Sequence, residues 1–212
     1  MGIKGENLNG VYGGNTLLDC IQKDIQDKIP DFENKNIAII GGGNVAMDCA
    51  RTFKKMGAQS VKIIYRRAKE QMPAEKCEIE QAVSEGIELI FQTNIVSING
   101  DKHVQEIECI KTELILKNGE ERPVPIDIPN SNYTINTDYV ITAIGSQPEI
   151  RVTEKTGMQL NKNGYINVDE NYKTSDEKIW AGGDIINNKA TVAWAALTGK
   201  KAAENIDKYF KK

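Results

Sequence analysis

The sequence predicts an α/β fold with a Rossmann-like, three-layer dinucleotide-binding domain. Three observations predict it. A short apolar strand at residues 36–40 leads directly into the glycine triplet 41–43. An amphipathic helix follows over residues 44–56, and a second apolar strand follows at residues 61–65. Strand, glycine turn, helix and strand in this order form a right-handed parallel crossover, which is the central unit of this fold class.

Composition and charge narrow the class of protein further. The 212 residues carry 27 basic and 30 acidic side chains, so the net charge of −3 gives no basic excess that would favour nucleic acid as a partner. The chain has neither the ~18 consecutive apolar residues of a membrane span nor a secretory segment at its start, and we expect a cytoplasmic protein without a membrane partner. The single histidine, His103, and four scattered cysteines predict no metal site and a plain surface role for His103.

The segments around the crossover are assigned from periodicity and turn residues. Residues 1–20 are rich in Gly and Asn and predict a loop, while apolar spacing predicts a helix over 16–29. A helix is expected at 74–85 and a strand at 88–92. Residues 95–135 alternate between apolar and polar side chains and contain turn signals, which predicts an antiparallel hairpin or meander.

The last third of the chain changes in character. A buried strand is expected at residues 138–144, followed by a polar, loop-like stretch to residue 178 with a short strand near 165–168. Residues 178–181 predict another strand, and residues 192–210 predict a final amphipathic helix. We expect this C-terminal strand–helix segment to complete or flank the dinucleotide-binding domain.

The glycine turn has the GxGxxA pattern that binds the pyrophosphate of a dinucleotide. Its first glycine permits a tight turn, its second lets the ligand approach the backbone, and the small last residue lets helix and strand pack closely. The free N–H groups at the helix N-terminus then face the pyrophosphate, with the helix dipole behind them. The predicted binding residues are Gly41, Gly42, Gly43, Asn44, Val45 and Ala46.

The end of the second strand indicates which dinucleotide binds. NAD sites usually place a carboxylate there for the ribose hydroxyls, but this chain has Tyr65, Arg66 and Arg67. Since arginine pairs bidentately with phosphate, the 2′-phosphate of NADP(H) is favoured over NAD(H). Adjacent strand residues point to opposite faces, so we expect one arginine to bind the phosphate unless the strand has already ended. A solvated arginine pair is the alternative interpretation.

A second group of residues surrounds the start of the final helix. Gly183 and Asp184 follow the predicted strand 178–181, and Thr191 precedes the helix. An aspartate can accept a hydrogen bond from a sugar or ribityl hydroxyl, and free helix N–H groups can face a carbonyl or a phosphate. The residues alone fit a strand, a turn and a capped helix equally well.

These motifs together resemble the glutamate synthase small-subunit family of FAD- and NAD(P)-dependent oxidoreductases of the pyridine nucleotide-disulfide type. Residues 41–74 resemble its NADPH-binding segment, and Tyr-Arg-Arg followed by Met72-Pro73-Ala74 is quite specific to it. Residues 143–148 resemble its strand at the junction between nucleotide domains, and residues 179–206 resemble its closing FAD-binding motif. The resemblance adds Ala143 and Gly145 to the predicted site and implies that Gly183, Asp184 and Thr191 contact the flavin.

The resemblance also implies a domain organisation. Residues 1–34 are expected to be a return segment and helix from an FAD half, 35–146 the NADPH-binding domain, and 147–212 the C-terminal segment of the FAD-binding domain. In the family an FAD-binding βαβ unit and a cysteine-rich iron–sulfur domain come first, and this sequence contains neither. We therefore expect weak or no FAD binding, and no turnover, by this chain alone.

In function, the resemblance implies that the intact enzyme passes a hydride from NADPH to FAD. Electrons would go on through iron–sulfur centres to a partner such as a large catalytic subunit, and no catalytic side chain is predicted. The alternative is a stand-alone NADP(H)-binding or redox-sensing module without turnover. A self-sufficient dehydrogenase is disfavoured because the sequence offers no proton-relay set of side chains.

Overall fold

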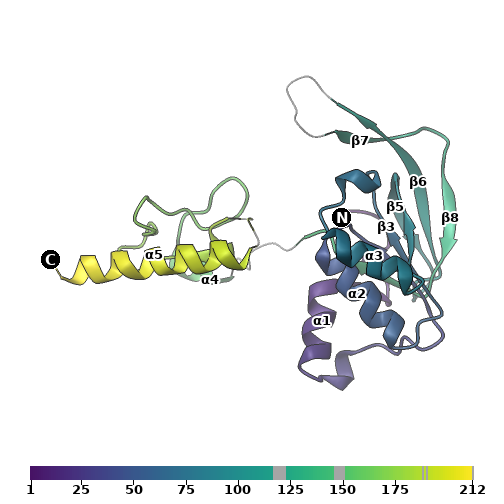
Figure 1. Cartoon of the computed structure of the whole chain (residues 1–212), viewed down its shortest axis with the longest axis horizontal. Coiled ribbons are helices and arrows are strands. Elements are labelled where there is room, and N and C mark those ends of the chain that lie inside the picture. The colour runs from purple at the N-terminus through teal and green to yellow at the C-terminus, as the bar shows by residue number, and fades with distance from the viewer. Residues whose placement is uncertain (117–122, 146–150, 188, 190, 212) are drawn as a thin grey trace. The chain divides into compact units, whose positions relative to one another are not determined.

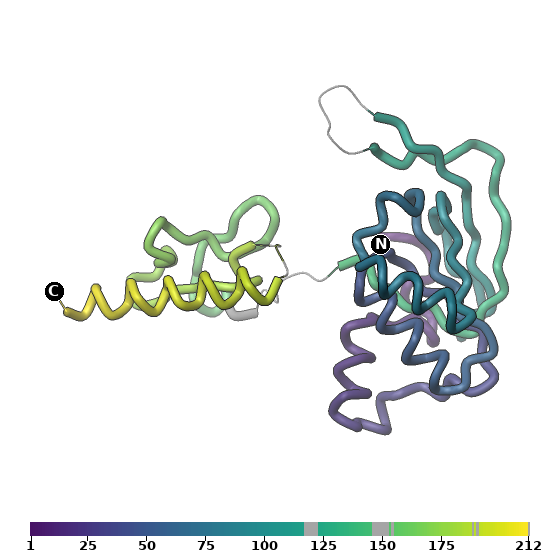
Figure 2. The backbone as a smooth tube through the Cα atoms, viewed as in Figure 1, coloured from purple at the N-terminus to yellow at the C-terminus, as the bar shows by residue number. Residues whose placement is uncertain are grey.

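The computed structural model describes residues 1–116, 123–145, 151–187, 189 and 191–211. The chain consists of two compact units, Met1–Gly145 and Ser146–Lys212. Figure 2 traces the backbone of the described residues in each unit. The first unit contains both β-sheets, and the second contains the long C-terminal helix (Figure 1).

A five-stranded parallel sheet forms the centre of the first unit, with the strand order β1-β9-β2-β3-β4. Its strands are β1 (Val11–Gly13), β9 (Tyr139–Thr142), β2 (Asn36–Ile40), β3 (Ser60–Ile64) and β4 (Glu88–Ile90). The predicted crossover is confirmed, because β2 and β3 pair in parallel and the helix α2 (Asn44–Lys55) connects them. The last of these strands in the sequence, β9, lies between β1 and β2.

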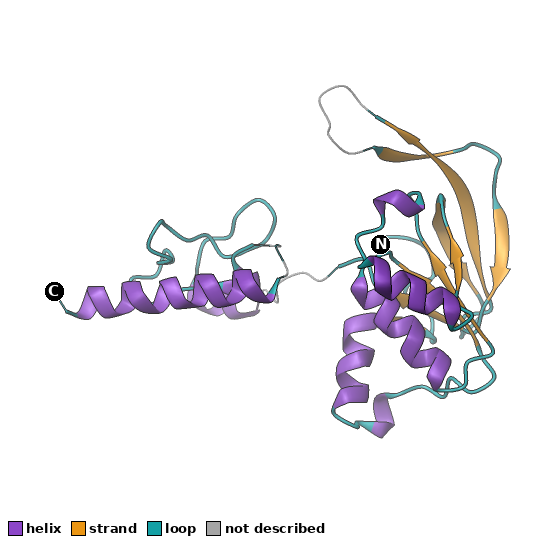
Figure 3. Ribbon diagram, in the orientation of Figure 1, coloured by secondary structure: helices purple, strands orange, loops and turns teal. Residues whose placement is uncertain are grey.

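Two further layers cover the parallel sheet (Figure 3). One consists of the helices α1 (Gly14–Gln22), α2 and α3 (Lys76–Ser84), supplemented by the 3₁₀ turns η1 (Gln26–Lys28) and η2 (Lys69–Gln71). The other is an antiparallel sheet of β5 (Thr93–Asn99), β6 (Glu106–Ile115), β7 (Val124–Asp127) and β8 (Tyr133–Asn136). Strand β6 pairs with all three of the others, which confirms the predicted meander.

Side chains along the central strands point alternately to the two faces of the sheet, and a separate apolar core lies on each face. In β2, Ile37 and Ile39 belong to the core under the helices, where Phe53 is fully buried. Ala38 points the other way, into the core shared with Ile107 of the antiparallel sheet. Because successive strand residues face opposite sides, a strand between two layers must be apolar throughout. This arrangement confirms the predicted three-layer α/β class.

The start of the chain differs from its prediction. The expected loop over residues 1–20 is wrong, because it contains β1 and most of α1. The helix expected over 16–29 ends at Gln22. Asp24 has a left-handed backbone (φ 52°), and the N–H of Ile25 donates to the carbonyl of Cys20 at 2.9 Å, which closes the helix.

The second unit contains α4 (Arg151–Thr156), the 3₁₀ turn η3 (Gly183–Ile185) and α5 (Val192–Phe210). Helix α5 is confirmed, whereas α4 lies in a stretch expected to be loop. The strands expected at 165–168 and 178–181 are wrong for the described residues. Only single-residue bridges form there, Leu160 with Ile166 and Lys173 with Trp180, so no ladder extends along either segment. Among the helices of the described ranges, none is long and apolar enough to cross a bilayer.

Candidate functional site

The glycine turn lies where the carboxyl ends of β2, β3 and β9 meet. The N–H of Gly41 donates to the carbonyl of Ile64 at 3.1 Å, and the N–H of Ala143 donates to the carbonyl of Ile40 at 2.7 Å. The structure therefore brings Ala143 to the predicted glycine turn, although about a hundred residues separate them in the sequence. In open α/β sheets, ligands bind outside the carboxyl ends of the strands.

The three glycines have different surroundings. Gly41 has a φ of +147°, and a Cβ there would lie 2.3 Å from the carbonyl oxygen of Ala143. A Cβ on Gly42 would lie 2.6 Å from the ring of Tyr65, whereas the nearest atom to a Cβ on Gly43 is 3.9 Å away, on Pro73. The first two glycines are thus required by protein packing even before any ligand is considered.

The N-terminus of α2 presents unpaired donors. Gly43 is its N-cap and no side chain caps the helix. The N–H of Ala46 donates to the carbonyl of Gly43 at 3.0 Å, but in the described ranges the N–H groups of Gly43, Asn44 and Val45 have no acceptor. Free N–H groups and the positive end of the helix dipole together attract an anion.

The strand β3 ends at Ile64, so Tyr65 and the two arginines lie in the loop that follows it. The carbonyl of Arg66 accepts a hydrogen bond from Thr112 Oγ1 at 2.8 Å, which fixes the backbone at this point. The Arg66 side chain is exposed and has no carboxylate partner in the part of the chain that the structure describes. Arg67 is half-buried, and its Nε donates to the carbonyl of Pro123 at 3.3 Å. The guanidinium of Arg66 is therefore more available to bind an anion than that of Arg67.

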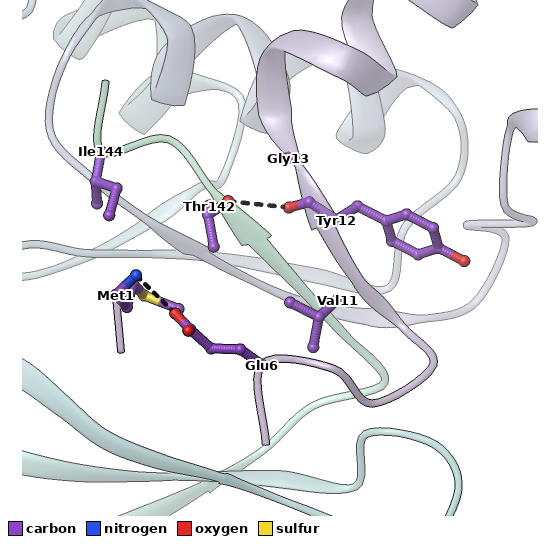
Figure 4. A pocket seen from close by; sticks show the side chains of 7 residues that line it. All are labelled: Met1, Glu6, Val11, Tyr12, Gly13, Thr142 and Ile144. Carbon is purple, nitrogen blue, oxygen red and sulfur yellow. Dashed lines mark hydrogen bonds and ion pairs between the residues drawn. The ribbon is translucent and has the colours of Figure 1, made fainter. Parts of the chain in front are cut away.

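A cavity of about 270 Å³ lies at the carboxyl ends of β1 and β9 (Figure 4). Gly13 and Ile40 both lie beside Thr142 in the sheet register, so this cavity is next to the glycine turn. Thr142 Oγ1 donates to the carbonyl of Tyr12 at 3.3 Å, and the ammonium group of Met1 pairs with the Glu6 carboxylate at 2.8 Å. No sequence motif pointed to this cavity, because strand β1 was itself missed.

The remaining predicted residues are found in two places. Gly145 has a φ of +109° and open space around it, and residues 146–148 of the same motif lie outside the described residues. In the second unit, the N–H of Gly183 (φ +79°) donates to Thr198 Oγ1 at 2.7 Å. Thr191 caps α5 by accepting from the N–H of Trp194 at 3.3 Å, and Asp184 is exposed. In the second unit, η3, which contains Gly183 and Asp184, thus packs against α5, the helix that Thr191 caps.

Two cysteines and the histidine, whose side chains could be reactive, have packing roles in the fold. Burial raises the pKa of the Cys49 and Cys109 thiols to about 12, so both are unreactive near neutral pH. The exposed His103 forms a T-shaped ring contact with Tyr139, with 5.5 Å between ring centroids. Over the described ranges, no group of three or more His, Cys, Asp or Glu side chains is placed to hold a metal ion.

The amino-acid sequence is similar to those of known proteins. Residues 1–199 match the pyridine nucleotide-disulphide oxidoreductase family. The chain is 34% identical over 214 residues to the NADP(+)-dependent formate dehydrogenase subunit beta of Moorella thermoacetica, covering 100% of this chain and 30% of that protein. It is 33% identical over 218 residues to the glutamate synthase (NADPH) small chain of Azospirillum brasilense, covering 98% of this chain and 45% of that protein.

The fold has a counterpart among solved structures. FprA of Mycobacterium tuberculosis, in complex with NADPH, superposes with a TM-score of 0.79 at 17% sequence identity, over 100% of this chain and 60% of that one.

The chain spans less than half the length of the two curated relatives, and the resemblance to glutamate synthase small chains is confirmed. With the family match extending over nearly its whole length, the chain belongs to the pyridine nucleotide-disulphide oxidoreductases.

Proposed function

We propose that this chain is the NADPH-binding part of a cytoplasmic flavin-dependent oxidoreductase. A hydride would pass from NADPH to FAD, and electrons would continue through iron–sulfur centres to a partner such as a large catalytic subunit. One observation carries the proposal: N–H groups at the start of α2 and the Arg66 side chain at the neighbouring strand end find no acceptor or carboxylate partner among the described residues. Two relatives whose names specify NADP(+) or NADPH support the same nucleotide.

The proposed binding mode divides the dinucleotide between two strand ends. The N–H groups of Gly43, Asn44 and Val45 would bind the pyrophosphate, since they have no acceptor in the described ranges. The guanidinium of Arg66 would pair with the 2′-phosphate, because a planar fork of donors matches two phosphate oxygens. The Nε of Arg67 already donates to the carbonyl of Pro123, but its two terminal nitrogens have no acceptor among the described residues and could contact the same phosphate.

The second unit would contribute to flavin binding. In the described ranges the N–H groups of Val192 and Ala193 have no acceptor, and Gly183 adds no side chain to the turn near α5. These features fit the edge of a flavin or a phosphate. When bound, the flavin would supply hydride acceptance, which no side chain of this chain provides. The FAD pyrophosphate would be held by an FAD-binding half outside these residues, so FAD binding by this chain alone should be weak or absent.

Calorimetric titration with NADPH and NADH, side by side, tests the proposal. We expect NADPH to bind at least tenfold more tightly, which corresponds to ~1.4 kcal/mol or more from the 2′-phosphate. Arg66→Ala should abolish this preference. Lys102→Ala is the matched control, because Lys102 is an exposed cation beside Asn9, at the amino end of β1. Equal affinities for the two nucleotides would contradict NADP(H) specificity, and no binding of either would contradict the proposed function.

A further inference from the structure

We propose that Tyr65 and Asn44 are positioning residues for the dinucleotide. They fasten the segment 71–75 to the glycine turn, and this attachment aims the N–H of Gly43 at the pyrophosphate. The inference rests on the proposed function. It adds Tyr65, which belongs to neither the glycine pattern nor the arginine pair, and it gives the side chain of Asn44 a role that the glycine pattern does not assign.

Three hydrogen bonds make the attachment, which we call the clasp. The hydroxyl of Tyr65 donates to the carbonyl of Gln71 at 2.7 Å. The N–H of Ala74 donates to the carbonyl of Gly42 at 3.1 Å. The N–H of Glu75 donates to Asn44 Oδ1 at 2.9 Å. The clasp therefore joins the glycine turn and the start of α2 to the residues that lead into α3.

Tyr65 is held firmly enough to support the turn. Its side chain is 7% exposed, and its ring occupies the space that a Cβ on Gly42 would need. The backbone N–H of Tyr65 donates to the carbonyl of Ile90 at 2.9 Å, and its carbonyl accepts from the N–H of Thr93 at 3.2 Å. The ring is therefore anchored to the sheet on one side and contacts the glycine turn on the other.

The clasp determines where the Gly43 N–H points. Every described peptide bond is trans, so the C=O of Gly42 and the N–H of Gly43, which share one peptide unit, point in opposite directions. Ala74 holds that C=O toward segment 71–75. The Gly43 N–H consequently points away from this segment, and it finds no acceptor in the described ranges. A donor fixed in this way binds an anion without first having to be ordered.

The clasp also changes the role expected of Asn44. Its side-chain oxygen is already engaged by the Glu75 N–H, so Asn44 would bind the ligand through its backbone N–H alone. The pyrophosphate is common to NADPH and NADH. Loss of the clasp should therefore weaken both dinucleotides by the same factor, whereas loss of Arg66 should weaken NADPH selectively.

Two variants test the clasp in the full chain, Tyr65→Phe and Asn44→Ala. Tyr133→Phe is the matched control for the first, because its hydroxyl lies 2.9 Å from Thr93 Oγ1, in the antiparallel sheet. Asn94→Ala is the control for the second, since its amide donates to Asp127 at 3.3 Å in that same sheet. Calorimetry would use NADPH, NADH and adenosine 2′-monophosphate, which has the 2′-phosphate but no pyrophosphate. Thermal unfolding would establish that each variant is folded at the titration temperature.

We expect each clasp variant to bind both dinucleotides about tenfold more weakly, equivalent to ~1.4 kcal/mol. The ratio of the two affinities and the affinity for adenosine 2′-monophosphate should stay unchanged, as should all three affinities in the controls. Unchanged dinucleotide affinities, or an equal loss for adenosine 2′-monophosphate, would overturn the clasp's role alone. A wild-type chain that binds neither dinucleotide would overturn the proposed function and the clasp with it.

Discussion

Gly41 and Gly43 belong to one tight turn, yet they tolerate a side chain to different extents. A Cβ on Gly41 would lie 2.3 Å from the Ala143 carbonyl oxygen, which is backbone of the neighbouring strand and cannot rotate away. Gly41 also has a φ of +147°, which residues with a Cβ rarely adopt. On Gly43 the nearest atom to a Cβ is 3.9 Å away, which is an ordinary contact distance.

We therefore expect Gly41→Ala to lower the free energy of unfolding by about 1–3 kcal/mol, the usual cost of overpacking. Gly43→Ala should lower it by less than ~1 kcal/mol, since it adds a methyl group to available space. Urea denaturation of both variants measures the difference. Equal destabilisation would mean that the contact with Ala143 does not constrain the turn.

The glycine spacing and the arginine pair were readable from the sequence, but their supporting contacts were not. The GxGxxA pattern predicted the turn because its chemistry is local to six residues. The hydrogen bond from Arg67 to Pro123 spans 56 positions, and nothing in the spacing of either residue indicates it. Tyr65 and Asn44 were missed as supports because the segment that they bind, 71–75, is irregular and has no periodicity.

An arginine of α2 forms ion pairs with one carboxylate of α3 and with the carboxylate of its C-cap residue. Arg51 Nη1 lies 2.7 Å from the Glu78 carboxylate, and its Nη2 lies 2.9 Å from the Glu85 carboxylate. The hydrogen bond from Arg51 lowers the pKa of Glu85 below its usual value of 4.5. A carboxylate whose pKa is lowered by folding stabilises the fold above its unfolded pKa, and this stabilisation is lost as the pH falls.

Arg51→Ala should accordingly make the free energy of unfolding less dependent on pH in the acidic range. We expect the variant to be less stable than the wild type at pH 7, and the difference to shrink as the pH falls below about 4.5 through the lowered pKa of Glu85. Urea midpoints measured between pH 3 and pH 7 test this. In the second unit, Lys200→Ala removes an exposed pair with Glu204 and should leave the acid dependence unchanged. A constant difference at every pH would show that Arg51 acts through packing instead.

Among the helices and strands, the sequence prediction was accurate where the pattern of apolar residues extended over enough residues to show its periodicity. Helix α5 and the crossover from β2 to β3 have clear periodicity and were located nearly to the residue. Strand β1 was missed because three residues are too few to show alternation. The first helix was extended too far because Ile25 and Ile29 keep helical spacing beyond the left-handed Asp24. In the second unit, single bridges replaced the expected strands because pairing does not propagate along them.

For the whole molecule, both apolar cores consist of residues of the first unit. The core under the helices and the core beside the antiparallel sheet lie entirely between residues 3 and 143. The glycine turn and both arginines also lie in this unit. The first unit therefore has the buried surface and the proposed nucleotide-binding residues of an independent domain.

We expect residues 1–145 alone to unfold cooperatively and to bind NADPH within about threefold of the full chain, a difference below ~0.7 kcal/mol. Differential scanning calorimetry and NADPH titration of the fragment measure both properties. The full chain titrated in parallel is the control. A fragment that aggregates or melts without a cooperative transition would show that the second unit is required for folding.

The position of β9 has a consequence for the order of folding. Strand β1 ends at Gly13, yet its parallel neighbour β9 begins only at Tyr139, and β9 also supplies the second neighbour of β2. During synthesis, the edges of β1 and β2 that pair with β9 in the folded sheet would therefore stay unpaired in this register until β9 has been made and inserts between them. Non-local parallel pairings of this kind form slowly, and exposed strand edges invite aggregation while they wait. The strand that brings Ala143 to the glycine turn is thus also the strand that closes the sheet, so the proposed nucleotide site and the complete sheet would form in the same late step.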